Sequence, residues 1–144
     1  MAGIQIVQAD ERDSNWEHHV PRFRVYLHGS GEAETSGWTD TYDITGADVL
    51  QVLDWAQRQA GGSLTYAIAL AYDDEEQERL NPGRARGLVW LVGRDGNDDV
   101  AGDDSGAEVQ RRMLARRAHP VNVPEADRMP TDVPDPYNDG TKRR

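Results

Sequence analysis

The side chains most able to do chemistry form a dense acidic cluster near the middle of the chain. Its carboxylates are Asp73, Asp74, Glu75, Glu76 and Glu78. Like charges this close repel one another, so we expect a compensating cation: Mg²⁺, a basic protein surface, or the nearby Arg79, Arg84 and Arg86. A run of this kind is also typical of a plain solvated surface, and that alternative stays open. If the cluster binds anything, we expect a basic protein partner.

His28 and Ser30 are the residue types of a hydrolytic site, two positions apart at the end of an expected strand. Residues two apart share one face of a strand, so the two side chains could meet. The nucleophile elbow of hydrolases needs glycine two positions before and after the serine, and His28 and Glu32 occupy those places. A small hydrolytic enzyme is therefore the alternative interpretation, and we predict no catalytic residue.

Metal ligation is suggested by one pattern, which is incomplete. Asp95, Asn97 and Asp99 match the first three ligand positions of a calcium-binding loop. Val100 and Gly106 stand where that loop needs glycine and glutamate. The histidines match no zinc-binding spacing, and the chain has no cysteine. The sequence therefore predicts neither a metal site nor a cofactor.

Two tryptophans are further candidates for binding. Trp16 lies in a polar segment, and Trp55 falls about 60° outside the apolar stripe of an expected helix at 100° per residue. Indole rings are enriched in recognition surfaces, but they are also ordinary residues at the edge of a core. Both interpretations stay open, and we name Trp16 and Trp55 as candidate partner-binding residues.

The strands that would position these residues follow from the hydrophobic period. Alternation over 22–28 and 38–44 predicts two strands joined by a long loop. Segment 63–72 alternates large apolar side chains with threonine and alanine, which predicts a central strand with a helix close to its small face. The charged stretch 73–86 predicts a turn, and the continuous apolar run 87–92 predicts another buried strand.

Two helices complete the expected fold. Thr45 and Asp48 fit a capping box at the start of a helix that ends near residue 60, with Asp54 and Arg58 on its polar side. Its apolar stripe comprises Val49, Val52, Leu53, Ala56 and Ala60. A second, basic helix is expected over 105–118. This order favours the α+β class: a mostly antiparallel sheet of four or five strands, one packed amphipathic helix and one basic helix.

Composition limits the functional classes. The 144 residues carry a net charge of −10, and residues 1–104 hold 8 arginines against 20 acidic side chains. An acidic body repels phosphates, which argues against nucleic-acid binding. No apolar run approaches the roughly 20 residues of a membrane span, and the N-terminus has no signal pattern, so we expect a cytoplasmic protein. We expect a single domain over 1–119 and a disordered, proline-rich tail over 120–144.

Charge distribution and the failure of each catalytic template favour a non-catalytic acidic binding protein. Its expected partner is a basic protein, engaged as an inhibitor, an immunity protein or a DNA mimic would engage it. The alternatives are the hydrolytic enzyme built on His28 and Ser30, and a subunit of a larger assembly attached by the basic tail. The oligomeric state is left open.

Overall fold

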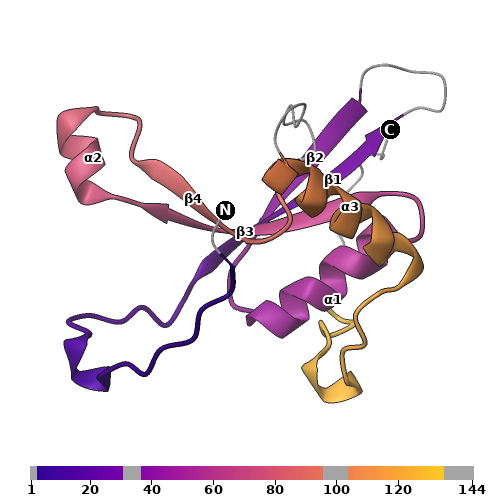
Figure 1. Ribbon diagram of the computed structural model, residues 1–144, viewed down its shortest axis with the longest axis horizontal. Coiled ribbons are helices and arrows are strands. Elements are labelled where there is room, and N and C mark those ends of the chain that lie inside the picture. Colours follow the sequence, from indigo (N-terminus) through magenta and orange to yellow (C-terminus); the bar gives the residue numbers. More distant parts are fainter. Residues whose placement is uncertain (1–2, 31–36, 96–103, 135–144) are drawn as a thin grey trace.

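Four antiparallel strands form the centre of this computed structural model, which describes residues 3–30, 37–95 and 104–134 (Figure 1). The strands lie in the order β2-β1-β3-β4. They are β1 (Arg22–Ser30), β2 (Gly37–Ile44), β3 (Thr65–Asp73) and β4 (Arg86–Val92). The helices are α1 (Val49–Ala60), α2 (Glu75–Leu80) and α3 (Asp104–Ala118), with 3-10 turns at Glu11–Asp13 and Glu125–Asp127. The predicted α+β class is confirmed.

One face of the sheet forms the main core together with α1. On this face Phe23 lies beside Leu70, Val25 beside Ile68, and Leu27 beside Tyr66. These side chains come from every second residue of β1 and β3, so alternation alone brings them to one face. The predicted central position of β3 is confirmed, because β3 pairs with β1 on one side and with β4 on the other.

The N-cap of helix α1 lies three residues later than the sequence predicts. Asp48, rather than Thr45, is the N-cap. The Asp48 side chain accepts a hydrogen bond from the Gln51 amide, and the Gln51 side chain accepts one from the Asp48 amide, each at 2.9 Å. The predicted Thr45 cap is wrong because Gln51 completes this reciprocal pair around Asp48.

The buried face of α1 is rotated relative to the predicted stripe. Val52 and Ala56 are buried as predicted, but Val49 is exposed and Trp55 is buried in its place. The Trp55 ring packs edge-on against Tyr42 of β2, with ring centroids 5.6 Å apart. Burying a tryptophan removes more apolar area from water than burying a valine, which favours this rotation.

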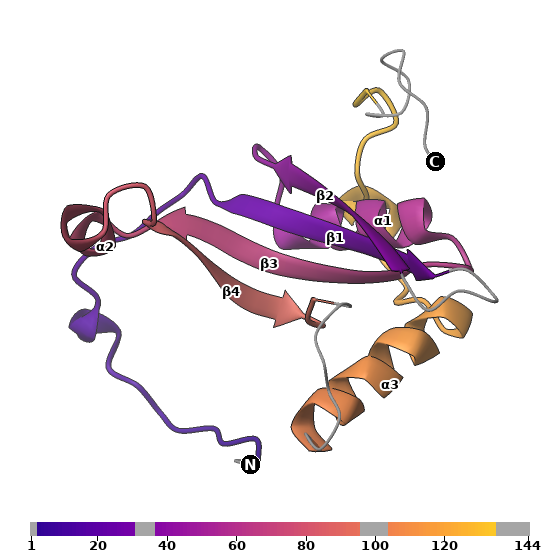
Figure 2. The same ribbon diagram turned by 90° about the horizontal axis from the view of Figure 1, so that it is seen from above.

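Helix α3 covers the opposite face of the sheet (Figure 2). Ala67 of β3 lies on that face, and Met113 of α3 is buried there beside Gly93, which follows β4. A Cβ on Gly93 would lie 3.1 Å from the Ala67 Cβ and 3.2 Å from the Met113 sulfur, so the close approach depends on glycine. The predicted packing of a helix on the small face of β3 is confirmed.

Strand β4 lies at the edge of the sheet, although its continuous apolar run predicts burial. Val89 and Leu91 are nearly half exposed, because α1 packs on β1 and β3 while α3 packs on β3. Trp90 is less exposed than these two residues. Its ring packs against Tyr26 across the small side chains of β3, with ring centroids 5.0 Å apart. The prediction of a buried strand is therefore wrong for β4.

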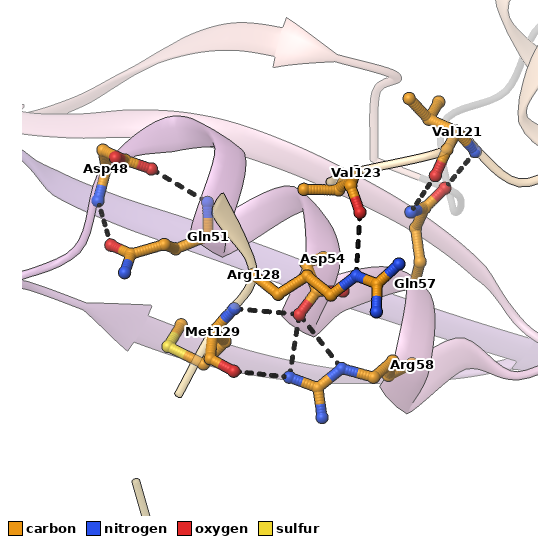
Figure 3. Close-up of polar contacts among 9 residues, drawn as sticks. All are labelled: Asp48, Gln51, Asp54, Gln57, Arg58, Val121, Val123, Arg128 and Met129. Carbon is orange, nitrogen blue, oxygen red and sulfur yellow. Dashed lines mark hydrogen bonds and ion pairs between the residues drawn. The ribbon is translucent and has the colours of Figure 1, made fainter. Parts of the chain in front are cut away.

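The C-terminal segment, residues 119–134, lies along α1 (Figure 3). The Gln57 side chain accepts a hydrogen bond from the Val121 amide at 2.6 Å and donates to its carbonyl at 2.9 Å. Val123 and Met129 are buried. The structure thus differs from the expected disordered tail over 120–134, because side chains of α1 form hydrogen bonds with the backbone of this stretch and two of its apolar side chains are buried. Residues 135–144 lie outside the described residues.

Residues 3–20 form an N-terminal arm that projects from the sheet (Figures 1 and 2). Every residue of the arm is exposed, and the apolar run 4–7 is irregular, with Ile4 96% exposed. The arm joins β1 beside Arg22, which pairs with Ala71 of β3. It therefore leaves the sheet at the same end from which β3 continues into α2.

Candidate functional site

The acidic cluster lies on the connection between β3 and β4, which extends beyond the body of the molecule (Figures 1 and 2). Where the sequence predicts a turn, the structure forms the short helix α2. Asp74 is its N-cap, with one side-chain oxygen accepting hydrogen bonds from the Glu76 amide at 2.9 Å and the Gln77 amide at 3.4 Å. Acidic residues in the first turn also favour a helix, so the cluster itself explains α2.

Asp73 is held by the strand opposite it. Arg86 faces Asp73 across the β3–β4 ladder and donates to both carboxylate oxygens, at 2.7 and 3.2 Å. This hydrogen-bonded pair lowers the pKa of the Asp73 carboxyl and raises the pKa of Arg86. The charge of Asp73 is therefore matched within the chain, which leaves it less available to a partner than the glutamates of α2.

The carboxylates of α2 are only weakly held. Glu76 pairs with Arg79 at 2.6 Å, and Glu78 accepts a hydrogen bond from the Gly83 amide at 3.2 Å. The Glu75 side chain makes no hydrogen bond or ion pair within the described part of the chain. All three glutamates are exposed, and exposed ion pairs contribute only about 0–1 kcal/mol to stability. A basic partner could therefore replace these contacts at little cost.

Apolar side chains accompany the acidic ones on this connection, and the alternation of apolar residues does not predict their exposure. Tyr72 is 50% exposed and Leu80 is 61% exposed. The 12 residues of α1 span about 18 Å, whereas the 9 residues of β3 span about 30 Å. The helix therefore cannot cover the end of β3. This difference in length is the signal in the sequence that predicts an uncovered strand end.

The two candidate tryptophans lie in different environments. Trp16 is 79% exposed on the N-terminal arm, so it remains available to a partner. Trp55 is 6% exposed and packs against Tyr42 in the core. A side chain this buried offers little contact surface, so Trp55 is less available to a partner than Trp16.

The described structure adds no further support to the hydrolytic site or the calcium-like pattern. His28 Nδ1 lies 3.2 Å from the Thr39 hydroxyl of β2, and the Ser30 side chain lies outside the described residues. Asn97 and Asp99 of the calcium-like pattern also lie outside them. Within residues 3–30, 37–95 and 104–134, no three side chains gather in a group that could hold a metal ion.

A second ion pair lies on the same sheet face as the Asp73–Arg86 pair. Arg24 faces Asp43 across the β1–β2 ladder and donates to both carboxylate oxygens, at 2.7 and 3.0 Å. Hydrogen bonding to Arg24 lowers the pKa of Asp43, and the charge of Arg22 lowers it further. These cross-strand pairs hold the strands together on the face opposite α1.

Comparison with known proteins finds no relative of this chain. No protein-family model matches the chain, and no curated protein or solved structure matches it. Among the described residues, no helix combines the length and the apolar character needed to cross a membrane.

Proposed function

We propose that this protein is a non-catalytic binding protein whose α2 hairpin engages a basic protein partner. The α2 hairpin comprises residues 72–92: the end of β3, helix α2 and strand β4. The observation that carries the proposal is the combination of exposed carboxylates and exposed apolar side chains on one projecting connection. Interfaces between proteins use this combination, with apolar side chains at the centre and charged ones around them.

The two kinds of side chain would have different roles in binding. Glu75 and Glu76 would attract lysine or arginine side chains and raise the rate of encounter, because charge mainly governs association rates. Tyr72 and Leu80 would supply the apolar area that slows dissociation once the complex has formed. The proposal thus requires a partner surface that has basic groups beside an apolar patch.

The position of the α2 hairpin supports this role. Strand β3 pairs on both sides, and the Asp73–Arg86 pair fixes the point at which α2 leaves the sheet. A binding surface that is held on a rigid sheet loses less conformational entropy when the complex forms. The N-terminal arm leaves the same end of the sheet and carries the exposed Trp16, which can extend the contact area.

Site-specific photo-crosslinking in an extract of the native host tests the proposal. A photoreactive amino acid replacing Leu80 should form an adduct with a protein of net positive charge, and added salt should reduce its yield. The matched control replaces Leu114, which is 42% exposed on α3. Equal adducts from both positions, or none from Leu80, would exclude the α2 hairpin as the binding surface.

A further inference from the structure

A cavity of about 370 Å³ lies where the C-terminal ends of α1 and α3 meet the start of β3. Its walls come from α1, the turn at residues 61–62, the residues around the start of β3 and the last turn of α3. Small-molecule sites occupy about 300–1,000 Å³, so the cavity could admit a small ligand. It lies at the end of β3 opposite to the α2 hairpin, and the two surfaces are separate.

Arg116 gives this cavity its chemical character. Its Nη1 atom is buried, and no hydrogen-bond acceptor in the described part of the chain reaches it. A buried charged donor without an acceptor is destabilising, and Arg116 also lines a second hollow between α3 and β4. A rotation of the guanidinium group toward an oxyanion in the first cavity would give Nη1 an acceptor. The guanidinium group matches the geometry of carboxylates and phosphates, to which it can donate two parallel hydrogen bonds.

The other charged groups around the cavity are largely matched. Arg58 pairs with Asp54 at 2.8 Å, and Arg117 donates to the Ser63 carbonyl at 3.1 Å. The C-terminal ends of α1 and α3 add about half a negative charge each. Three arginines and one aspartate line the walls, so the cavity keeps a positive character within a chain of net charge −10. An anion would therefore be attracted here and repelled by most of the remaining surface.

The rest of the wall is mostly apolar, and its polar groups are the Gln57 amide and one hydroxyl group. Ala60, Leu64 and the ring of Tyr66 line it. The Tyr66 hydroxyl donates a long hydrogen bond to the Gln57 side-chain oxygen at 3.4 Å, and it can exchange this weak contact for a hydrogen bond to a ligand. Burial raises the pKa of Tyr66, which keeps the phenol protonated and able to donate.

We propose that this cavity binds a small organic anion in which a carboxylate or phosphate is attached to an apolar ring. Arg116 holds the oxyanion through its paired N–H groups, and the Tyr66 hydroxyl donates a further hydrogen bond. The ring lies against Ala60 and Leu64. Carboxylate and phosphate share this chemistry, so separate probes must distinguish them.

Calorimetric titration of the full chain with benzoate, phenyl phosphate and inorganic phosphate, each up to about 10 mM, tests the proposal. At least one aromatic probe should bind, and inorganic phosphate should bind about tenfold more weakly because it leaves the apolar wall uncovered. Arg116→Gln should weaken binding by about tenfold or more. The control Arg111→Gln changes an exposed arginine of the same helix, paired with Glu108, and should alter affinity less than about twofold.

A second variant keeps the test decisive if Arg116→Gln folds poorly. Tyr66→Phe retains the buried ring and should weaken binding by a few fold, because only the hydroxyl donor is lost. Failure of both aromatic probes to bind the wild-type chain would overturn the proposal. Unchanged affinity in Arg116→Gln, or in Tyr66→Phe where the first variant does not fold, would also overturn it. Equal affinity for inorganic phosphate would contradict the role of the apolar wall.

Discussion

At the scale of single residues, Asp54 links two parts of the molecule that are far apart in the chain. It is a buried carboxylate on α1 that accepts hydrogen bonds from the Arg58 guanidinium and, at 2.9 Å, from the Met129 amide. The helical period puts Asp54 on the polar side of α1, away from the sheet. The C-terminal segment covers that side and converts a solvent-facing position into a buried one.

Removing this carboxylate should loosen the C-terminal segment. We expect Asp54→Ala to lower the free energy of unfolding by about 1–3 kcal/mol, because the Met129 amide and Arg58 lose their acceptor. Urea denaturation measures the change. Asp132→Ala, at an exposed position of the same segment, should stay within about 0.5 kcal/mol of wild type. Equal effects of the two substitutions would show that the Asp54 contacts contribute little.

The ion pair between Arg24 and Asp43 predicts a pH dependence. The folded-state pKa of Asp43 is lowered, so its stabilising effect is present above the ordinary carboxyl pKa of 3.8 and is lost as the pH falls below it. Asp43→Asn should therefore unfold at a lower temperature than wild type at neutral pH, and the two midpoints should converge in acid. The exposed Glu75→Gln serves as control. A constant difference at every pH would contradict the role of the ionised pair.

At the scale of elements, the sequence predicts the sheet well and the C-terminal segment poorly. Alternation is a property of each strand itself, so β1, β2 and β3 follow from their own residues. The contacts of the C-terminal segment are made by isolated residues, Val123 and Met129, within a polar stretch rich in proline. Their spacing has no regular period, so the sequence does not show that they are buried. They become buried because the segment lies along α1.

Two truncations test whether the C-terminal segment is packed against α1 or disordered. Deleting 120–144 removes two buried apolar side chains and should lower stability by about 3–6 kcal/mol, since each buried side chain contributes about 1.5–3 kcal/mol. Deleting only 135–144 retains every hydrogen bond between α1 and the segment and should change stability little. Thermal unfolding of both variants measures the difference. If the longer deletion is as stable as the shorter one, the segment does not contribute to the folded core.

At the scale of the whole molecule, the acidic charge and the exposed apolar residues coincide at one end of the sheet. The sequence predicts the acidic half of this surface, because a charge run is visible in any window of the chain. The apolar half depends on which strand ends the helices leave uncovered, and the lengths and arrangement of α1, α3 and the sheet determine this. The same arrangement shows why Asp74 must be kept in any binding test, since it caps α2.

The most direct measurement of the central proposal is the association rate with the crosslinked partner across a salt series. The test variant combines Glu75→Gln, Glu76→Gln and Glu78→Gln, and the control combines Glu125→Gln, Asp127→Asn and Asp132→Asn, which remove the same charge elsewhere. If the α2 hairpin steers the encounter, the test variant should associate more slowly and with a flatter salt dependence, because the screening length falls from about 10 Å at 0.1 M to about 3 Å at 1 M salt. The control should match wild type. Equal rates and equal salt dependence in the two variants would contradict an acidic binding surface on α2.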